Sequence, residues 1–302
     1  MLSALIESYI ALRRTLGCSY ERPARCLRRF AAFATQRGEN HVRAQTAIEW
    51  SRLAGSQQER DRCLKTIARF ARHAVAEDPR HEVPRNDLFA YRRQRPTPYI
   101  FSPEDIHRLV QEGYRLRPRG TLRPLAFATL FALLAATGLR IGEALRLRLT
   151  DVTLDGLQIR HTKFRKSRLV PLHETAAAGL ARYLAVRQNP GAQDFVFVDH
   201  RGRGLRPDSV RSVFRRLVRK LGLVRGPEQP RPHVHSLRHS FAVRSLESCS
   251  HDSASVQRHM VALSTYLGHS AVAHTYWYLE ATPQLLGTIC RAYEDYCQGA
   301  SR

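Results

Sequence analysis

The chain has 302 residues, of which 43% are hydrophobic, so it is long and apolar enough to bury a core in about two domains. This composition excludes an intrinsically disordered chain, and because no apolar run reaches ~18 residues we expect no membrane-spanning helix. The formal net charge is +23, from 49 Lys and Arg against 26 Asp and Glu, which indicates a polyanionic partner such as nucleic acid. Residues 1–17 show no signal-peptide pattern, and we expect a cytoplasmic protein with no membrane partner.

The first part of the chain carries apolar residues at helical spacing. In its first segment Leu5, Ile6, Tyr9 and Leu12 recur so that they share one helix face. We expect helices joined by short loops, and therefore a small helical bundle over residues 1–94. Those helices are predicted over 2–17, 21–37, 46–54 and 56–76.

A Pro- and Arg-rich segment separates this bundle from the rest of the chain. Pro84, Pro96 and Pro98 interrupt helix formation, so we place a linker at 95–100 and a second domain at 101–302. That domain is predicted to be mainly α with a small antiparallel β-sheet, and Ser102 is expected to cap its first helix. Further helices are expected at 122–137, 141–148, 174–187, 207–222, 237–247, 254–267 and 282–298, and strands at 152–161, 168–173 and 195–198.

A group of residues suited to bind phosphate gathers near the C-terminus. His235 and Arg238 form an H-x-x-R pair, and on a helix this spacing puts both side chains on one face. A guanidinium binds two phosphate oxygens at once, and an imidazole donates a hydrogen bond or a proton. His269 follows in the sequence LGHS, and Tyr278 comes after it, where its phenol can serve as a covalent nucleophile.

Two upstream residues complete the group. Arg140 follows a Thr-Gly turn and opens a helix, and Lys163 lies in a predicted hairpin over 161–173. The chain resembles the tyrosine recombinase (phage integrase) family, and the ending STYLGHS…TYWYL is similar to a transposon-borne branch of that family. The family's ordered pattern of Arg, Lys, His-x-x-Arg, His/Trp and Tyr falls on Arg140, Lys163, His235, Arg238, His269 and Tyr278.

The resemblance implies both a fold and a reaction. It implies a SAM-like core-binding helical domain before the linker and a tyrosine recombinase catalytic domain after it. It implies that Tyr278 attacks a phosphodiester to give a 3′-phosphotyrosyl link, without a metal or any other cofactor. In this reaction Arg140 and Arg238 bind the phosphate, Lys163 is the general acid, His235 accepts a proton or binds the phosphate, and His269 donates a hydrogen bond.

Some positions have a competing interpretation. Lys166 is the second choice for the general acid, and Tyr276 is the second choice for the nucleophile. His239 is interpreted as structural, and Glu143 and Asp151 as residues that orient the catalytic groups. A zinc site is disfavoured because closed zinc sites use four ligands, whereas only Cys249, His251 and His259 cluster in the sequence.

The excess of basic residues predicts contacts to DNA phosphates. Candidates in the first domain lie on its helices, and those in the second lie in the hairpin and on the helix at 207–222. They are Arg13, Arg14, Arg25, Arg28, Arg29, Arg62 and Arg69, followed by Lys166, Arg211, Arg215 and Arg219.

The favoured function is a site-specific DNA recombinase or integrase of a mobile element, acting on double-stranded DNA with specific recombination sites. The resemblance implies a homotetramer, or a mixed tetramer with related recombinases, on that DNA. The helix expected at 282–298 docks either on a neighbouring protomer or on its own domain. A type IB topoisomerase and a non-catalytic DNA-binding accessory paralogue are the alternatives.

Overall fold

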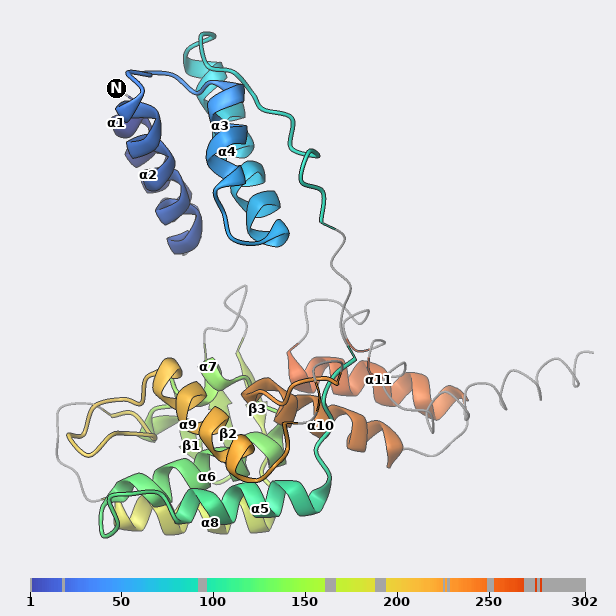
Figure 1. Cartoon of the computed structure of the whole chain (residues 1–302). Coiled ribbons are helices and arrows are strands. Elements are labelled where there is room, and N and C mark those ends of the chain that lie inside the picture. The colour runs from blue at the N-terminus through green and yellow to red at the C-terminus, as the bar shows by residue number, and fades with distance from the viewer. Residues whose placement is uncertain are drawn as a thin grey trace, which may run out of the picture. The chain divides into compact units, whose positions relative to one another are not determined.

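The computed structural model describes residues 2–17, 20–91, 97–160, 167–187, 194–224, 226, 229–248, 253–268, 275 and 278. The chain divides into two compact units, Met1–Arg95 and Pro96–Arg302 (Figure 1). Each unit has a hydrophobic core of its own. The division falls within the Pro- and Arg-rich segment of the sequence.

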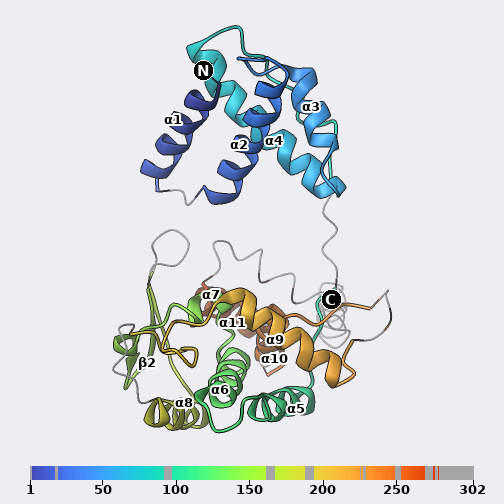
Figure 2. The ribbon, with the colours of Figure 1, turned by 60° about the vertical axis from the view of Figure 1, so that its left-hand side comes forward.

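The described part of the N-terminal unit is a bundle of four helices. Their apolar faces enclose Ile6, Leu27, Phe30 and Phe70, which are fully buried. Leu12, which the sequence pattern places inward, is 45% exposed, because α1 buries only the face that carries Ile6. The helices, which Figure 2 shows from a second side, are α1 (Leu2–Thr15), α2 (Glu21–Gln36), α3 (Ala44–Arg52) and α4 (Gln57–Glu77).

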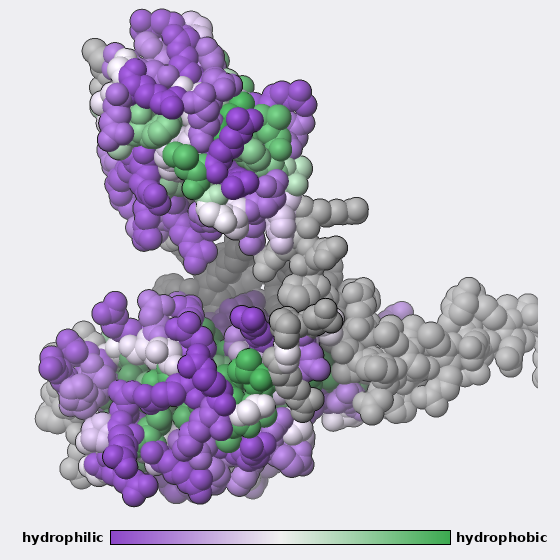
Figure 3. Space-filling view, in the orientation of Figure 1, coloured by the Kyte–Doolittle hydropathy of each residue, from purple (hydrophilic) through white to green (hydrophobic). Residues whose placement is uncertain are grey.

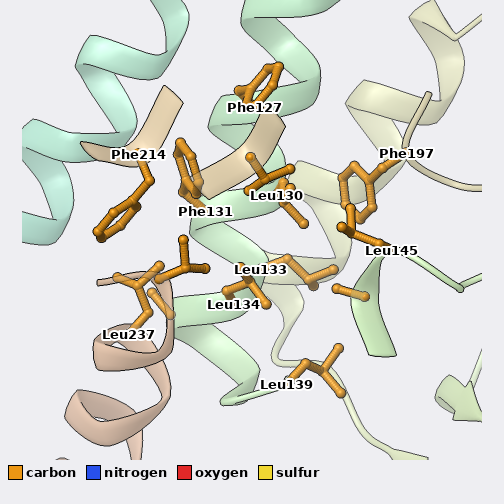
Figure 4. Close-up of a cluster of buried hydrophobic side chains, with 14 of the residues drawn as sticks. Phe127, Leu130, Phe131, Leu133, Leu134, Leu139, Leu145, Phe197, Phe214 and Leu237 are labelled. Atoms are coloured by element: carbon orange, nitrogen blue, oxygen red, sulfur yellow. The ribbon is translucent and has the colours of Figure 1, made fainter. Parts of the chain in front are cut away.

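The C-terminal unit is organised around α6 (Leu122–Thr137). This helix is apolar on all sides, as expected of a helix surrounded by other elements. Its side chains, including Phe127 and Phe131, form a core with Phe197 (Figure 4). Phe131 also lies edge to face against Phe214 of α9 (Pro207–Lys220), with ring centroids 5.6 Å apart. The prediction of a buried helix at 122–137 is confirmed.

The other described helices of this unit pack around α6 or on one another. Ser102 caps the first of them by accepting a hydrogen bond from the Asp105 amide at 3.1 Å, as predicted. α10 packs on α6, and α11 packs in turn on α10. The bounds are α5 (Pro103–Tyr114), α8 (Glu174–Val186), α10 (Val234–Glu247) and α11 (Ser253–Leu267).

A small antiparallel sheet accompanies the helices. Its strands β1 (Val152–Thr153), β2 (Gly156–Ile159) and β3 (Arg168–Val170) follow one another in the sheet in chain order. Leu157 is paired with Val170, and Ile159 with Arg168. The segment predicted as one strand at 152–161 is two strands, because residues 154–155 turn the chain. The mainly helical fold with a small antiparallel sheet is confirmed.

The predicted strand at 195–198 is wrong. Phe195 forms an isolated bridge with Arg148, and Val198 forms another with Gly204, but the segment does not join the sheet of β1, β2 and β3. Val196 and Phe197 are fully buried. The apolar run therefore reflects burial in the core rather than strand pairing, two causes that produce the same short pattern.

Helix boundaries differ most from the prediction at α7 (Ile141–Ala144) and α10. The helix expected at 141–148 is only α7, and a 3₁₀ turn follows at Leu149–Asp151. The helix expected at 237–247 begins earlier, at Val234, so His235 belongs to the first turn of α10. The helix expected at 282–298 lies outside the described residues.

Hydrophilic side chains cover most of the visible face of each unit (Figure 3). Among the residues that the structure describes, no helix combines the length and the apolar character needed to cross a membrane.

Candidate active site

Arg140 is placed by the turn that ends α6. Gly138 closes the helix with φ of +61°, a conformation that favours glycine, and a Cβ at this position would lie 2.5 Å from Phe241. Arg140 comes two residues after this glycine and directly precedes α7. The Thr-Gly pair before Arg140 therefore acts as the helix stop that its sequence indicates.

Glu143 holds Arg140 in position. The Arg140 guanidinium donates to Glu143 Oε1 at 2.8 Å, and the Arg140 amide donates to Glu143 Oε2 at 3.1 Å. Glu143 is buried, whereas the Arg140 side chain remains 35% exposed. A buried carboxylate thus orients an arginine that still reaches solvent.

Arg238 is the largest side chain among those that are fully buried in the described residues. From α10 its guanidinium donates to the Gly138 carbonyl and to the Leu267 carbonyl, each at 2.7 Å. Burial, followed by the positive charge of Arg140, lowers the pKa of Arg238 to about 10, so this residue is still a cation at neutral pH. Arg140 and Arg238 therefore form a pair of neighbouring positive charges.

Arg168 joins this site, although the sequence analysis did not select it. It extends from β3 and donates to Glu143 Oε2 at 2.8 Å and to the Tyr266 carbonyl at 2.7 Å. Alternation along the strand puts Arg168 on the same side as buried Val170. An arginine on the inward side of a strand is the signal that could have identified it.

The C-terminal end of α11 receives three arginines, which we call the arginine cap. The final carbonyls of a helix lack partners within the helix and carry partial negative charge, which cations stabilise. Gly268 ends the helix with φ of +66°, and a Cβ there would lie 2.8 Å from Arg168. The pairs are Arg168 with the Tyr266 carbonyl, Arg238 with the Leu267 carbonyl and Arg140 with the Gly268 carbonyl.

Tyr278 lies between α10 and α11. It is 3% exposed and packs in a cluster with Val243 and Leu267. Burial raises the pKa of Tyr278, while the charge and hydrogen bonding of Arg238 and then the charge of Arg140 oppose that rise. The structure therefore brings the predicted nucleophile to the two predicted phosphate-binding arginines.

Three histidines at the start of α10 form a cluster, and one of them, His239, contacts Tyr278. His239 Nδ1 lies 3.1 Å from Tyr278 Oη, and the His239 ring meets the His235 ring edge to face at 4.7 Å. His233 lies 5.9 Å from His239 between ring centroids. The residue interpreted as structural, His239, thus contacts the predicted nucleophile directly.

His235 is predominantly neutral at physiological pH. Although the residue still reaches solvent, desolvation by the atoms around its ring and then the positive charge of Arg238 lower its pKa to about 4. A neutral imidazole can accept a proton or donate one hydrogen bond. The predicted H-x-x-R pair is therefore present as one neutral and one cationic group.

Other predicted residues lie outside the described residues. These are Lys163, Lys166, His269 and Tyr276. Of the three disfavoured zinc ligands, His259 is described, and its Nε2 lies 3.0 Å from Ser245 Oγ. Cys249 and His251 lie outside the described residues.

The arginines predicted to contact DNA are surface residues, with Arg13 half-buried and Arg14, Arg25, Arg28, Arg29, Arg62, Arg69, Arg211, Arg215 and Arg219 exposed. Some of them pair with carboxylates in the protein. Arg28 binds both oxygens of Glu7 at 2.7 Å, and Arg14 contacts Glu21 at 2.9 Å. Arg62 pairs with Glu59, and Arg211 with Asp208. When these four arginines bind phosphate, the new contacts would replace or extend their exposed ion pairs. Such ion pairs contribute little to stability, so their loss costs little.

We expect Glu143→Gln to lower the stability of the protein at neutral pH. Burial alone would raise the pKa of Glu143, but hydrogen bonds and charge from Arg168 and then Arg140 lower it to about 2. Glu143 therefore has a lower pKa in the folded protein than in the unfolded chain, and between these two values the unfolded chain binds more protons. The stabilisation by Glu143 is complete above the pKa of the unfolded chain and is lost as the pH falls toward 2. The shift corresponds to about 3 kcal/mol.

Denaturant unfolding of the wild type and Glu143→Gln at pH 7 and pH 3 measures this effect. The stability difference between the two should shrink by about 2 kcal/mol at the lower pH. Asp155→Asn, in the exposed turn between β1 and β2, is the matched control and should change stability by less than about 0.5 kcal/mol. A difference that does not depend on pH would contradict the electrostatic role of Glu143.

The sequence also matches known proteins. Residues 101–284 match the family model described as the phage integrase family. The Sinorhizobium fredii protein named integrase/recombinase y4rB is 36% identical over 300 residues, which cover 96% of this chain and 96% of that protein. The tyrosine recombinase XerC of Alcanivorax borkumensis is 31% identical over 232 residues, which cover 76% of this chain and 70% of that protein.

Two solved structures share the fold. The XerH site-specific recombinase bound to palindromic difH substrate has a TM-score of 0.66 and 18% identity, covering 91% of this chain and 79% of that chain. The Tn1549 transposon integrase in complex with a circular intermediate DNA has a TM-score of 0.65 and 18% identity, covering 92% of this chain and 94% of that chain. On these matches, and on the order of its motif residues, the chain belongs to the phage integrase family of tyrosine recombinases.

Proposed function

We propose that the protein is a site-specific DNA recombinase that cleaves and rejoins strands through a 3′-phosphotyrosyl intermediate on Tyr278, for the integration or transposition of a mobile element. The observation that carries the proposal is the convergence of Arg140, Arg238 and Tyr278 at the end of α11, where the two arginines bind the Gly268 and Leu267 carbonyls and Tyr278 packs in the cluster that contains Leu267. This arrangement suits attack by a phenol on an anionic diester, because the same cations stabilise the phenolate and the phosphate.

The guanidinium groups would bind the non-bridging oxygens of the scissile phosphate. Each guanidinium has five N–H donors, and the hydrogen bonds of Arg140 and Arg238 to the protein occupy only some of them. Tyr278 Oη then bonds to phosphorus, and the bond from phosphorus to the 5′-oxygen breaks. Lys163 would protonate that oxygen, with His235 and His269 as further hydrogen-bonding partners of the phosphate. No metal ion takes part in this scheme.

Double-stranded DNA carrying specific recombination sites is the proposed partner. The first domain, residues 1–94, and the second, residues 101–302, would both bind the DNA through the basic residues named above. The formal charge of +23 supports such a partner. XerH was solved bound to difH substrate, and lambda integrase as a tetramer bound to a Holliday junction. We extend this to a homotetramer, or a mixed tetramer with related recombinases, assembled on DNA.

The test uses duplex DNA from the ends of the element that encodes the protein, with a nick that lets the severed fragment diffuse away. A denaturing gel run after incubation with EDTA should show a protein–DNA adduct, and digestion should place the protein on a 3′-phosphate. Binding to verified ends without any adduct would replace the proposal by an accessory DNA-binding role. Relaxation of supercoiled plasmid without strand exchange would favour a type IB topoisomerase.

A further inference from the structure

His239 follows Arg238 directly on α10, and both side chains are buried. Successive helix residues point in different directions, so two neighbours are both buried only where the helix is covered on more than one side. α10 meets this condition because it packs on α6 and on α11. The two side chains therefore make different contacts. Arg238 donates hydrogen bonds to the Gly138 and Leu267 carbonyls.

The contact of His239 is with Tyr278. Nδ1 lies 3.1 Å from Tyr278 Oη, and the two rings are 5.6 Å apart and tilted by 54°. With the proton of the imidazole on Nε2, Nδ1 presents a lone pair to the phenol, and the phenol donates the hydrogen bond. This is the geometry that a general base requires, since a base must lie within about 2.6–3.2 Å of the atom whose proton it takes.

Burial raises the pKa of Tyr278, and neighbouring positive charges partly offset this rise. Arg238 and Arg140 stabilise negative charge on Tyr278 Oη. His235, the residue to which the family pattern assigns a proton transfer, contacts the His239 ring edge to face, with ring centroids 4.7 Å apart. His239 thus contacts both Tyr278 and His235.

We propose that His239 is a catalytic residue, whose Nδ1 accepts the Tyr278 proton as Oη bonds to phosphorus. This inference rests on the proposed function. In cleavage the bond from Oη to phosphorus forms, the bond from phosphorus to the 5′-oxygen breaks, His239 becomes imidazolium and the 5′-oxygen takes a proton from the general acid. In rejoining, the incoming 5′-hydroxyl bonds to phosphorus and its proton returns to the general acid. The bond from phosphorus to Oη breaks, and imidazolium returns the proton to Tyr278.

Two variants separate a base from a positioning residue. In His239→Asn the amide oxygen takes about the place of Nδ1, so it can still accept a hydrogen bond from Tyr278 but cannot take up the proton. In His239→Ala both properties are lost. We expect single-turnover cleavage of the nicked DNA to slow by about 10²-fold or more in both variants. His239→Gln is a second acceptor variant in case the Asn variant does not fold.

A second substrate distinguishes removal of the Tyr278 proton from donation of a proton to the 5′-oxygen. When sulfur replaces the bridging 5′-oxygen, the leaving group is a thiolate and needs no general acid. This substitution should restore cleavage by Lys163→Ala, yet leave His239→Asn as slow as before. His259→Ala is the matched control, because His259 is outside this histidine cluster and pairs with Ser245 Oγ at 3.0 Å, and it should cleave at close to the wild-type rate. Melting temperature and DNA affinity verify that each variant is folded.

The outcomes are distinct from those that test the recombinase function itself. Failure of the wild type to form an adduct in the same gel would reject the proposed function. If the wild type cleaves and His239→Asn matches it, His239 only positions Tyr278 and our assignment is overturned. Restoration of His239→Asn by the sulfur substrate would overturn it as well, because the histidine would then act on the leaving oxygen.

Discussion

Replacing Tyr278 by phenylalanine is expected to abolish the covalent protein–DNA adduct, with cleavage reduced by at least about 10⁴-fold, because no other group supplies the oxygen that bonds to phosphorus. DNA affinity should change little, since the phenol is buried rather than exposed on the binding surface. The loss of the hydrogen bond to His239 should lower the stability by only about 1 kcal/mol. The measurement is single-turnover cleavage of nicked DNA on a denaturing gel.

Tyr276→Phe is the matched control for this experiment. It removes the same hydroxyl group two residues earlier, and it should retain the adduct. Loss of the adduct in Tyr276→Phe alone would assign the nucleophile to Tyr276, and with it a different register for the chain after α11. Loss in both variants would show that the two hydroxyl groups depend on each other.

Replacing Arg238 by lysine should reduce cleavage by about 10³-fold with a much smaller change in DNA affinity. Arg238 spans two carbonyls with its two terminal nitrogens, those of Gly138 and Leu267, and a planar guanidinium can do this while it still presents N–H groups to a phosphate. An ammonium is a single point and cannot reach both carbonyls and the substrate together. The defect should therefore appear in the rate of the chemical step.

Arg244→Lys is the matched control on the same helix. Arg244 also donates to a carbonyl, that of Phe101 at 2.7 Å, but it is not one of the two arginines whose charges act on the pKa of Tyr278. Its substitution by lysine should leave the rate of cleavage close to that of the wild type. Equal defects in Arg238→Lys and Arg244→Lys, accompanied by equal losses of melting temperature, would mean that Arg238 acts through stability alone.

The sequence predicted those features that depend on local pattern. The apolar helix at 122–137 and the Ser102 cap follow from residue types within one or two helical turns. The positions of Arg140 and Arg238 could be predicted as well, because a Thr-Gly turn and an H-x-x-R spacing fix where these residues lie on their helices. The convergence of the two with Tyr278 came from the ordered motif and not from periodicity.

Features that depend on contacts between distant segments could not be predicted in this way. Arg168 lies 25 residues from Glu143 in the chain, and its ion pair exists only because β3 passes beside α7. His239 contacts Tyr278 across 39 residues, so no local pattern distinguishes it from a structural histidine. Residues 195–198 are apolar because they pack in the core of the domain, and this produces the same sequence pattern as a strand.

The arginine cap has a thermodynamic consequence for substrate binding. The groups that would receive the phosphate, Arg140 and Arg238, also hold the end of α11 in place. If an anion between the guanidinium groups favours the docked helix, the docked helix must favour the anion by the same free energy. Tyr278 follows Gly268 in the sequence, so the nucleophile is covalently connected to the element that this coupling stabilises. Binding of DNA and positioning of Tyr278 are then thermodynamically coupled.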